Sequence, residues 1–190
     1  MEDLALTISD VSGRVRPKLT KSIVLIGMMG SGKSHVGSLL AKALGLPHRD
    51  SDTLIEREER RKIADIFSTE GEAAFRVLER RMIERLLGED LSVISTGGGC
   101  LIVPETLQAI AKNGISVWLN APVDVLFERI KNSRNRPLMD AENPRQRLED
   151  LLEERKNLYA QADLVVEDPL AGIEALVLKV LITLEGYLDR

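Results

Sequence analysis

The chain has 190 residues, a length that suits one globular domain whose core is large enough to need no disulfides. Its formal net charge of −4 argues against a nucleic-acid-binding surface, which would be basic, although a small basic pocket remains compatible with it. The single cysteine, Cys100, excludes an internal disulfide, and we find neither a bilayer-length apolar stretch nor a secretory signal, so we expect a cytoplasmic protein with no membrane or nucleic-acid partner.

The first half of the chain alternates between helix and strand patterns. Residues 1–21 show no clean period, and we expect them to be a partly ordered N-terminal extension to a domain at residues 22–190. The β-branched run at residues 22–26 is typical of a buried parallel strand. Four further elements are expected in this half, namely a helix ending at Gly45, a short strand near 46–51, a charged helix at 53–62 and a longer helix at about 72–87.

The second half continues the alternation and predicts the fold class. We expect strands at 91–95, 115–119 and 164–166, and helices after Pro104, from Pro122 to about 131, at about 144–159 and at 171–188. Strands that alternate with helices indicate a three-layer α/β/α fold, in which a parallel sheet is covered on both faces. All strands then end at one edge, where ligands bind. The polar, proline-containing segment at about 132–143 is typical of a mobile lid.

The most specific motif is Gly27-Met-Met-Gly-Ser-Gly-Lys33-Ser34, which matches the phosphate-loop pattern G-x-x-x-x-G-K-[ST] between a predicted strand and a predicted helix. Its glycines let successive backbone N–H groups point at phosphate oxygens, and the helix N-terminus adds the positive end of its dipole. Lys33 is expected to reach the β- and γ-phosphates, and Ser34 to offer its hydroxyl to Mg²⁺. A plain glycine-rich turn is the alternative. The predicted ATP-binding residues of the loop are Gly30, Ser31, Gly32, Lys33, Ser34 and His35, of which His35 is expected on the helix surface without a chemical role.

Two carboxylates, Asp50 and Asp52, follow the second predicted strand. Two residues apart on an extended segment, they would point the same way, so that one holds the Mg²⁺ hydration shell and the other accepts a substrate hydroxyl. The aspartate usual at the end of the strand beside a phosphate loop is absent, because Ser95 stands there, which leaves Asp50 as the candidate magnesium ligand. The alternative is that Asp52 or Ser51 only caps the next helix.

An arginine and three glycines complete the candidate site. Arg76 follows the core-facing Phe75 and is placed to grip a substrate carboxylate, with Glu79 one helical turn away to orient it. The alternative is a solvated ion pair on a helix rich in charged residues. Three glycines at 97–99 follow a predicted strand, where the approach of a ligand to backbone N–H groups would require them; a flexible turn is the alternative.

Together these motifs resemble the shikimate kinase family. The phosphate loop, Asp50-x-Asp52, Phe75-Arg76, Gly97-Gly98-Gly99 and Arg136-Pro137-Leu138 occur in the family's order and spacing over about residues 22–185. The resemblance implies a P-loop kinase with a five-stranded parallel sheet in the order 2-3-1-4-5. It also implies ATP-dependent phosphorylation of the 3-hydroxyl of shikimate, in the pathway to chorismate and the aromatic amino acids, with one Mg²⁺ per subunit. We expect a monomer.

The resemblance further implies roles for single residues. Its catalytic residues are Lys33, Asp52 and Arg136, the last on the lid. Shikimate would be held by Asp52, Arg76, Gly97, Gly98, Gly99 and Arg155, with the two arginines on its carboxylate and Tyr159 closing the R-x-x-x-Y pattern of Arg155. The nucleotide would be held by the phosphate loop, Arg129, Arg136 and Pro169, with adenine between Arg129 and Pro169. The metal would be held by Ser34 and Asp50.

Two other functions remain open from the residues alone. Another small-molecule kinase, for gluconate or a nucleoside monophosphate, would share the loop, although we find no clear base-reading pocket. A nucleotide-dependent switch or an ATP-binding interaction module is the non-enzymatic alternative. The guanine motif Asn-Lys-x-Asp of a GTPase is absent, whereas Asp50, Asp52 and Arg136, which an inactive module should lack, are present.

Overall fold

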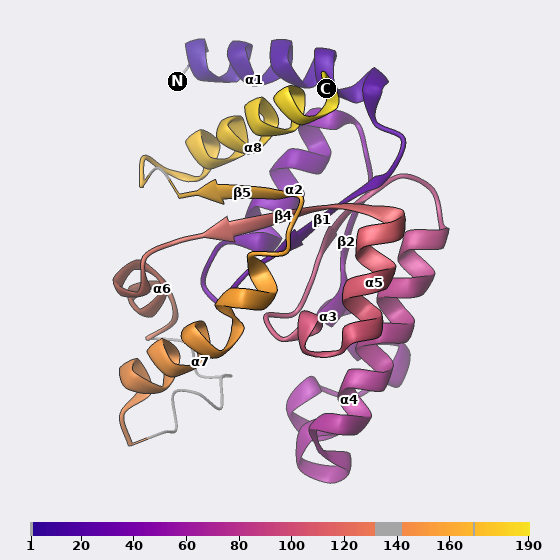
Figure 1. Ribbon diagram of the computed structural model, residues 1–190, viewed down its shortest axis with the longest axis vertical. Helices are drawn as coiled ribbons and strands as arrows, with labels where there is room; N and C mark the ends of the chain where they lie inside the picture. Colours follow the sequence, from indigo (N-terminus) through magenta and orange to yellow (C-terminus); the bar gives the residue numbers. More distant parts are fainter. Residues whose placement is uncertain (1, 132–141, 169) are drawn as a thin grey trace.

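A five-stranded parallel sheet forms the centre of the molecule, in a computed structural model that describes residues 2–131, 142–168 and 170–190 (Figure 1). Its strands are β1 (Ser22–Ile26), β2 (His48–Asp50), β3 (Val93–Ser95), β4 (Gly114–Asn120) and β5 (Leu164–Glu167). Their order across the sheet is β2-β3-β1-β4-β5, and each neighbouring pair is parallel. The predicted α/β class and strand order are confirmed.

Helices lie on both sides of this sheet (Figure 1). They are α1 (Glu2–Val15), α2 (Lys33–Leu44), α3 (Ser51–Glu59), α4 (Ile63–Gly88), α5 (Pro104–Asn113), α6 (Val123–Ile130), α7 (Pro144–Tyr159) and α8 (Ile173–Leu188), with short 3₁₀ turns at Arg16–Lys18 and Cys100–Ile102. The bounds of α7 agree with the prediction, because Asn143 caps its N-terminus and Pro144 occupies its first position. Most of the predicted lid, residues 132–141, lies outside the described residues. Within the described ranges, no helix combines the length and apolar character needed to cross a membrane.

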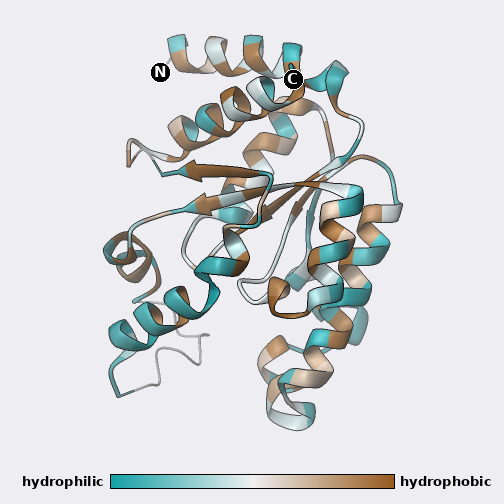
Figure 2. Ribbon diagram, viewed as in Figure 1, coloured by the Kyte–Doolittle hydropathy of each residue, from teal (hydrophilic) through white to brown (hydrophobic). Residues whose placement is uncertain are grey.

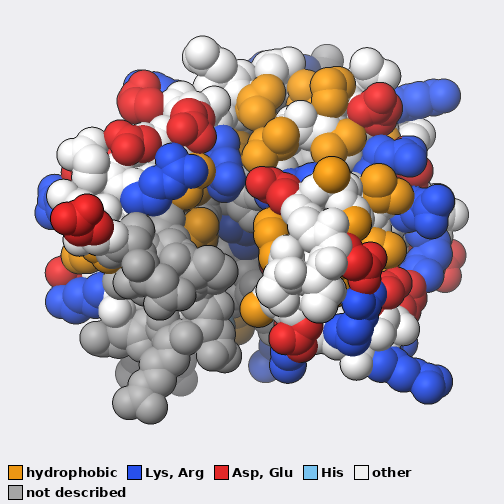
Figure 3. Space-filling model, turned by 90° about the horizontal axis from the view of Figure 1, so that it is seen from below, with side chains coloured by type: hydrophobic (Ala, Val, Ile, Leu, Met, Phe, Trp, Pro, Cys, Tyr) orange, Lys and Arg blue, Asp and Glu red, His pale blue; other side chains and the backbone are white. Residues whose placement is uncertain are grey.

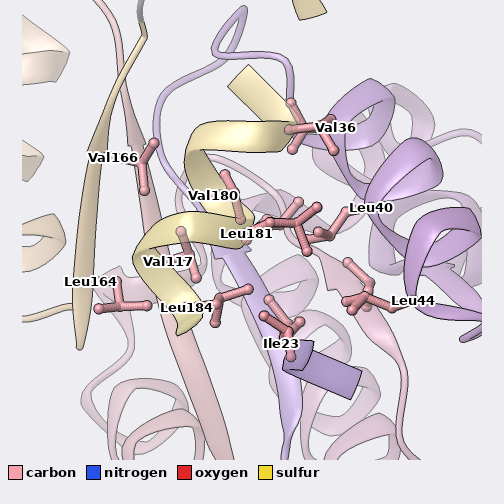
Figure 4. Packing of buried hydrophobic residues seen from close by; sticks show 14 of the residues in the cluster. Ile23, Val36, Leu40, Leu44, Val117, Leu164, Val166, Val180, Leu181 and Leu184 are labelled. Atoms are coloured by element: carbon pink, nitrogen blue, oxygen red, sulfur yellow. The ribbon is translucent and has the colours of Figure 1, made fainter. Parts of the chain in front are cut away.

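The two faces of the sheet pack into separate hydrophobic clusters. Alternate strand residues such as Ile23 and Val117 point to one face, where they meet Leu40 of α2 and Val180 of α8 (Figure 4). The intervening residues, such as Val24, point to the opposite face and pack with α4 and α5. The central strands β1, β3 and β4 are therefore mostly apolar on both faces (Figure 2), as a parallel sheet between two helical layers requires, whereas the edge strand β2 is polar.

The N-terminal segment is an ordered helix, so the prediction of a partly ordered extension is wrong. α1 lies along α8 on its outer side (Figure 1), and Val11 and Val15 are buried in the cluster that α8 shares with the sheet. Arg14 forms an ion pair with Glu185 across this contact. Ile8, Val11 and Val15 do recur at helical spacing, but polar residues and a glycine interrupt the pattern, and the surface that they cover comes from the other end of the chain.

We expect the alanine variant of Val15 to lower the free energy of unfolding by about 1–3 kcal/mol, because it leaves a cavity at a fully buried position. Urea denaturation followed by circular dichroism measures this change. Leu6→Ala on the same helix is the control, since Leu6 is 63% exposed and its truncation should change stability by less than about 0.5 kcal/mol. Equal effects of the two substitutions would mean that α1 does not contribute to the core.

Helix α4 consists of two helical segments that meet at one glycine. The segment after Gly71 agrees with the helix predicted at about 72–87, whereas the helical residues from Ile63 up to the glycine were not predicted. Gly71 interrupts them with φ of 84° and ψ of 173°, a conformation that glycine adopts without steric strain. After the break, Phe75 and Met82 face the core as predicted, which places residue 76 at the edge of that face.

Candidate active site

The phosphate loop connects β1 to α2 at the edge of the sheet where the strands end. Gly30 and Gly32 have φ of 82° and 91°, left-handed values that other residues rarely adopt. Gly32 directly precedes α2, and no side chain caps that helix. The N–H groups of the first turn and the positive end of the helix dipole therefore remain available to an anion. The predicted context of the motif, a strand before and a helix after, is confirmed.

Lys33 is the first residue of α2, and its side chain folds over the loop. The residue is only 8% exposed, and Nζ donates hydrogen bonds to the carbonyls of Gly27 at 2.8 Å and Met28 at 3.0 Å. A cavity of about 640 Å³ opens beside it, and the predicted site residues that line this cavity are Gly30, Gly32, Lys33, Ser34, His35, Asp50, Asp52, Gly97, Gly98 and Arg129. Ser31 is buried instead, and His35 is exposed as predicted.

The two aspartates both line the cavity, but not for the predicted reason. Asp50 ends β2 and caps α3, because its Oδ1 accepts from the N–H of Thr53 at 3.1 Å, while its Oδ2 accepts from the Ser34 hydroxyl at 2.7 Å. Asp52 lies in the first turn of α3. The two carboxylates therefore do not sit on one extended segment, and that reasoning is wrong. Capping does occur here, but by Asp50 rather than by Asp52 or Ser51.

The donors at Ser34 and Asp50 fit a magnesium ion. One hydroxyl and one carboxylate, already within hydrogen-bond distance of each other, are hard oxygen ligands of the kind that Mg²⁺ prefers. Mg²⁺ is usually bound by one or two carboxylates together with substrate phosphates and water. The adjacent phosphate loop is the place where such phosphates would lie.

Arg76 forms ion pairs with two glutamates of its own helix. Its Nη1 contacts Glu79 Oε2 at 2.6 Å, and its Nη2 contacts Glu72 Oε1 at 2.7 Å. The Arg76 and Glu79 side chains are only 13% and 1% exposed, whereas Glu72 is 57% exposed. The alternative of a solvated ion pair therefore applies only to Glu72. Glu79 orients Arg76 from the protein interior, as the spacing predicted.

The glycine turn after β3 lies against these charged groups. A Cβ atom at Gly97 would collide with Oε1 of Glu79 and would come within 3.0 Å of Oδ1 of Asp52, and one at Gly99 would collide with the Arg76 guanidinium. The charged ends of Glu79 and Arg76 thus lie directly against the backbone of the turn, and a side chain at Gly97 or Gly99 would force them to move.

The middle glycine connects the turn to α7. The carbonyl of Gly98 accepts hydrogen bonds from Nη1 of Arg155 at 3.2 Å and from the Tyr159 hydroxyl. Arg155 and Tyr159, the two ends of the R-x-x-x-Y pattern, thus share one acceptor. Arg155 reaches the glycine turn from α7, and Arg76 reaches it from α4.

Two buried carboxylate oxygens face this turn without a hydrogen-bond partner among the described residues, Oδ1 of Asp52 and Oε1 of Glu79. Burial raises the pKa of Glu79 to about 7, against the opposing effect of Arg76. Burial also raises the pKa of Asp52, and the charge of Asp50 adds to this effect. The site therefore combines two arginines with two buried carboxyl groups of raised pKa beside an anion-binding loop. On its lower face the molecule is hollowed, and Lys and Arg side chains lie in the hollow and beside part of its rim (Figure 3).

Comparison with known proteins decides the family. The sequence matches the family model for shikimate kinase over residues 29–185. The chain belongs to the shikimate kinase family. It is 44% identical over 180 residues to a shikimate kinase of Rhizobium meliloti, covering 95% of this chain and 93% of that protein.

Two solved structures of the family support the same assignment. The shikimate kinase of Acinetobacter baumannii, determined in complex with shikimate, superposes with a TM-score of 0.82 at 38% identity, covering 85% of this chain and 90% of that one. The enzyme of Aquifex aeolicus superposes with a TM-score of 0.77 at 39% identity, covering 87% and 96%. Members of the shikimate kinase family use ATP with a divalent metal.

Arg129, the residue expected to stack on adenine, lines the same cavity as the phosphate loop and the glycine turn. Its Nη2 forms an ion pair with Oδ2 of Asp168 at 2.7 Å, and its Nη1 donates to the carbonyl of Gly30 at 3.3 Å. The Asp168 side chain is only 3% exposed. Sequence reasoning missed Asp168, whose only signal was its position at the end of the last predicted strand. Arg136 and Pro169, which the same reasoning named, lie outside the described residues.

The Glu79 carboxyl is expected to make the stability of the kinase depend on pH. Its pKa is raised from 4.5 to about 7 on folding, so the folded state binds the proton more tightly than the unfolded state. The resulting stabilisation is complete below about pH 4.5 and is lost as pH rises through about 7. The unfolding free energy of wild type should therefore fall between pH 5 and pH 8. In Glu79→Gln, which lacks this carboxyl group, the fall should be smaller by about 1–3 kcal/mol.

Urea denaturation of both proteins at several pH values measures this difference. Glu84→Gln on the same helix is a suitable control, because Glu84 is 40% exposed. Parallel pH profiles for wild type and Glu79→Gln would show that Glu79 ionises normally in the folded protein.

Proposed function

We propose that this chain transfers the γ-phosphoryl group of ATP to the 3-hydroxyl of shikimate, giving shikimate 3-phosphate for the pathway to chorismate and the aromatic amino acids. The observation that carries the proposal is the convergence of Asp52, Arg76 and the glycine turn beside the Lys33 loop. The arginines at the turn match the single carboxylate of such an acceptor. Asp52 and the backbone groups of the turn match its hydroxyls.

We assign the substrate carboxylate to Arg76 and Arg155, which reach the same turn from different helices. A guanidinium binds a carboxylate through two parallel hydrogen bonds, which also fixes the orientation of the ring. Asp52 and the glycines at 97–99 take the hydroxyls. The unpartnered oxygen of Asp52 is suited to accept a hydroxyl proton, because burial raises its pKa and so increases its affinity for that proton.

We assign the phosphates to the loop at residues 27–34. Lys33 and the first turn of α2 stabilise the negative charge on the transferred group, which is the main requirement of phosphoryl transfer. Ser34 and Asp50 would hold one Mg²⁺ per subunit, which neutralises phosphate charge when it is bound. Arg129 is assigned to the adenine, and His35 borders the cavity without a chemical role. Roles for Arg136 on a lid at about 132–143 and for Pro169 at the adenine stay predictions.

We also propose that the kinase domain spans residues 22–190 and acts as a monomer in the cytoplasm. The segment at residues 1–21 then serves the fold rather than the chemistry, which is supported by the burial of Val11 and Val15 against α8.

The test is ADP release coupled to a spectrophotometric assay, with shikimate, gluconate or nucleoside monophosphates as acceptor. Of these acceptors, we expect only shikimate to support turnover, and we expect slow ATP hydrolysis when no acceptor is present. Faster turnover with gluconate or a monophosphate would show that shikimate is not the preferred acceptor. ATP binding without turnover on any acceptor would favour a binding module or switch over an enzyme.

A further inference from the structure

Strand β2 contacts the first turn of α2 through two side chains. His48 and Asp50 are two residues apart on this strand and therefore point to the same side. Asp50 accepts from the Ser34 hydroxyl at 2.7 Å. His48 contacts Lys33, the residue before Ser34, indirectly through Ser95. Nε2 of His48 lies 2.9 Å from the Ser95 hydroxyl, and this hydroxyl lies 3.0 Å from the Lys33 carbonyl oxygen.

The direction of each hydrogen bond in this chain follows from its chemistry. A backbone carbonyl only accepts, so the single hydroxyl proton of Ser95 is donated to the Lys33 oxygen. The Ser95 oxygen must then accept from His48, which requires a proton on Nε2 of the imidazole. His48 thus holds the Ser95 hydroxyl in the orientation that contacts α2.

Gly37 of α2 shows how closely the helix packs against this chain. A Cβ atom there would come within 2.6 Å of Nε2 of His48 and would collide with the Ser95 hydroxyl. Ser95 is 1% exposed, so an unpaired hydroxyl at this position could not turn to bulk solvent for a partner. The chain from β2 through β3 to α2 is therefore a packed and directional contact.

We propose that His48 is a positioning residue for the nucleotide–metal site. Through Ser95 it holds the first turn of α2 in the register that places the Ser34 hydroxyl beside Asp50. This inference rests on the proposed function, in which Ser34 and Asp50 hold the metal that accompanies ATP. Groups that orient metal ligands typically change metal affinity 10–100-fold when removed, and an effect relayed through a backbone carbonyl should lie at the lower end of that range.

The test compares His48→Phe, which removes the donor, with His48→Gln, whose side-chain amide can still donate. Isothermal titration calorimetry measures ADP binding with Mg²⁺ and with EDTA, in the absence of an acceptor. For His48→Phe we expect MgADP to bind about 10-fold more weakly, with less than about a twofold change for metal-free ADP. His48→Gln should bind MgADP within about twofold of wild type.

Two further variants make the outcome decisive. Ser95→Ala removes the acceptor, and we expect the same selective loss of MgADP affinity from it, with no further loss in the double variant because both residues act in one chain. Arg49→Gln, on the same strand but pointing to its other side, should leave MgADP affinity unchanged. If His48→Phe does not fold, Ser95→Ala carries the test.

Equal weakening with and without Mg²⁺, failure of His48→Gln to restore affinity, or unchanged binding in Ser95→Ala would each overturn the proposal. Since acceptor turnover does not enter these measurements, they are independent of whether shikimate is the substrate. A failed acceptor assay with intact metal-selective binding effects would therefore refute the proposed function and not the role of His48.

Discussion

Lys33→Met is expected to lower kcat by about 10²–10³-fold, the range found when one donor to transition-state charge is removed. The unbranched methionine retains most of the packing at this buried position, so the loop should keep its course. What is lost is the ammonium that now donates to the carbonyls of Gly27 and Met28. Its charge lies at the centre of the loop, where the transferred phosphoryl group would be stabilised.

Steady-state kinetics with saturating ATP and shikimate measure this effect. Lys42→Met is the matched control, because Lys42 lies exposed in the last turn of the same helix and should retain wild-type kcat. A variant with raised KM for ATP and intact kcat would contradict the role assigned to Lys33. That result would place Lys33 in ground-state binding of the nucleotide rather than in stabilisation of the transition state.

Arg76→Ala is expected to weaken shikimate binding by about 2–5 kcal/mol, the usual result of truncating one partner of a buried charge pair. On that scale the KM for shikimate rises about 30-fold or more. Two groups lose their cation at once, the substrate carboxylate and Glu79, whose side chain is 1% exposed. The KM for ATP should change little, since Arg76 lies against Gly99 and is not among the described residues that line the cavity beside the phosphate loop.

Initial rates measured against varied shikimate and against varied ATP separate the two constants. Arg80→Ala tests for a general effect on α4, since Arg80 pairs with Glu84 in an exposed i,i+4 ion pair on the same helix. Its removal should change stability by less than about 1 kcal/mol and leave both KM values unchanged. A near-normal KM for shikimate in Arg76→Ala would sink the assignment of Arg76 to the substrate carboxylate.

Most helices and strands could be predicted because their signals are local. The β-branched run at Ser22–Ile26 and the proline at the start of α7 each specify backbone conformation within a few residues. The break at Gly71 was less predictable. A glycine within a charged, weakly periodic stretch is compatible both with a helix start and with an interruption of a longer helix.

The residues of the candidate site could be identified from the sequence more readily than their arrangement could be predicted. Asp50 and Asp52 were both placed at the site, but their geometry was wrong, because the helix begins between them and turns Asp52 into its first turn. Asp168 was missed, since its importance lies in the ion pair that it forms with Arg129, a residue of a different element. The chain from His48 to Lys33 likewise joins three separate segments.

The sequence alone determined the phosphate loop, the alternation of strands and helices, and the set of residues from which the site is made. Each of these depends on neighbouring residues, whose backbone preferences and spacing act over one or two turns. Only the tertiary structure decided that α1 packs on α8, that Glu79 lies against Gly97, and that β2 contacts the start of α2. Those features arise from the burial and pairing of side chains that are far apart along the chain. A buried charge needs a partner and an apolar face needs a covering surface, and tertiary packing decides which distant residues supply them.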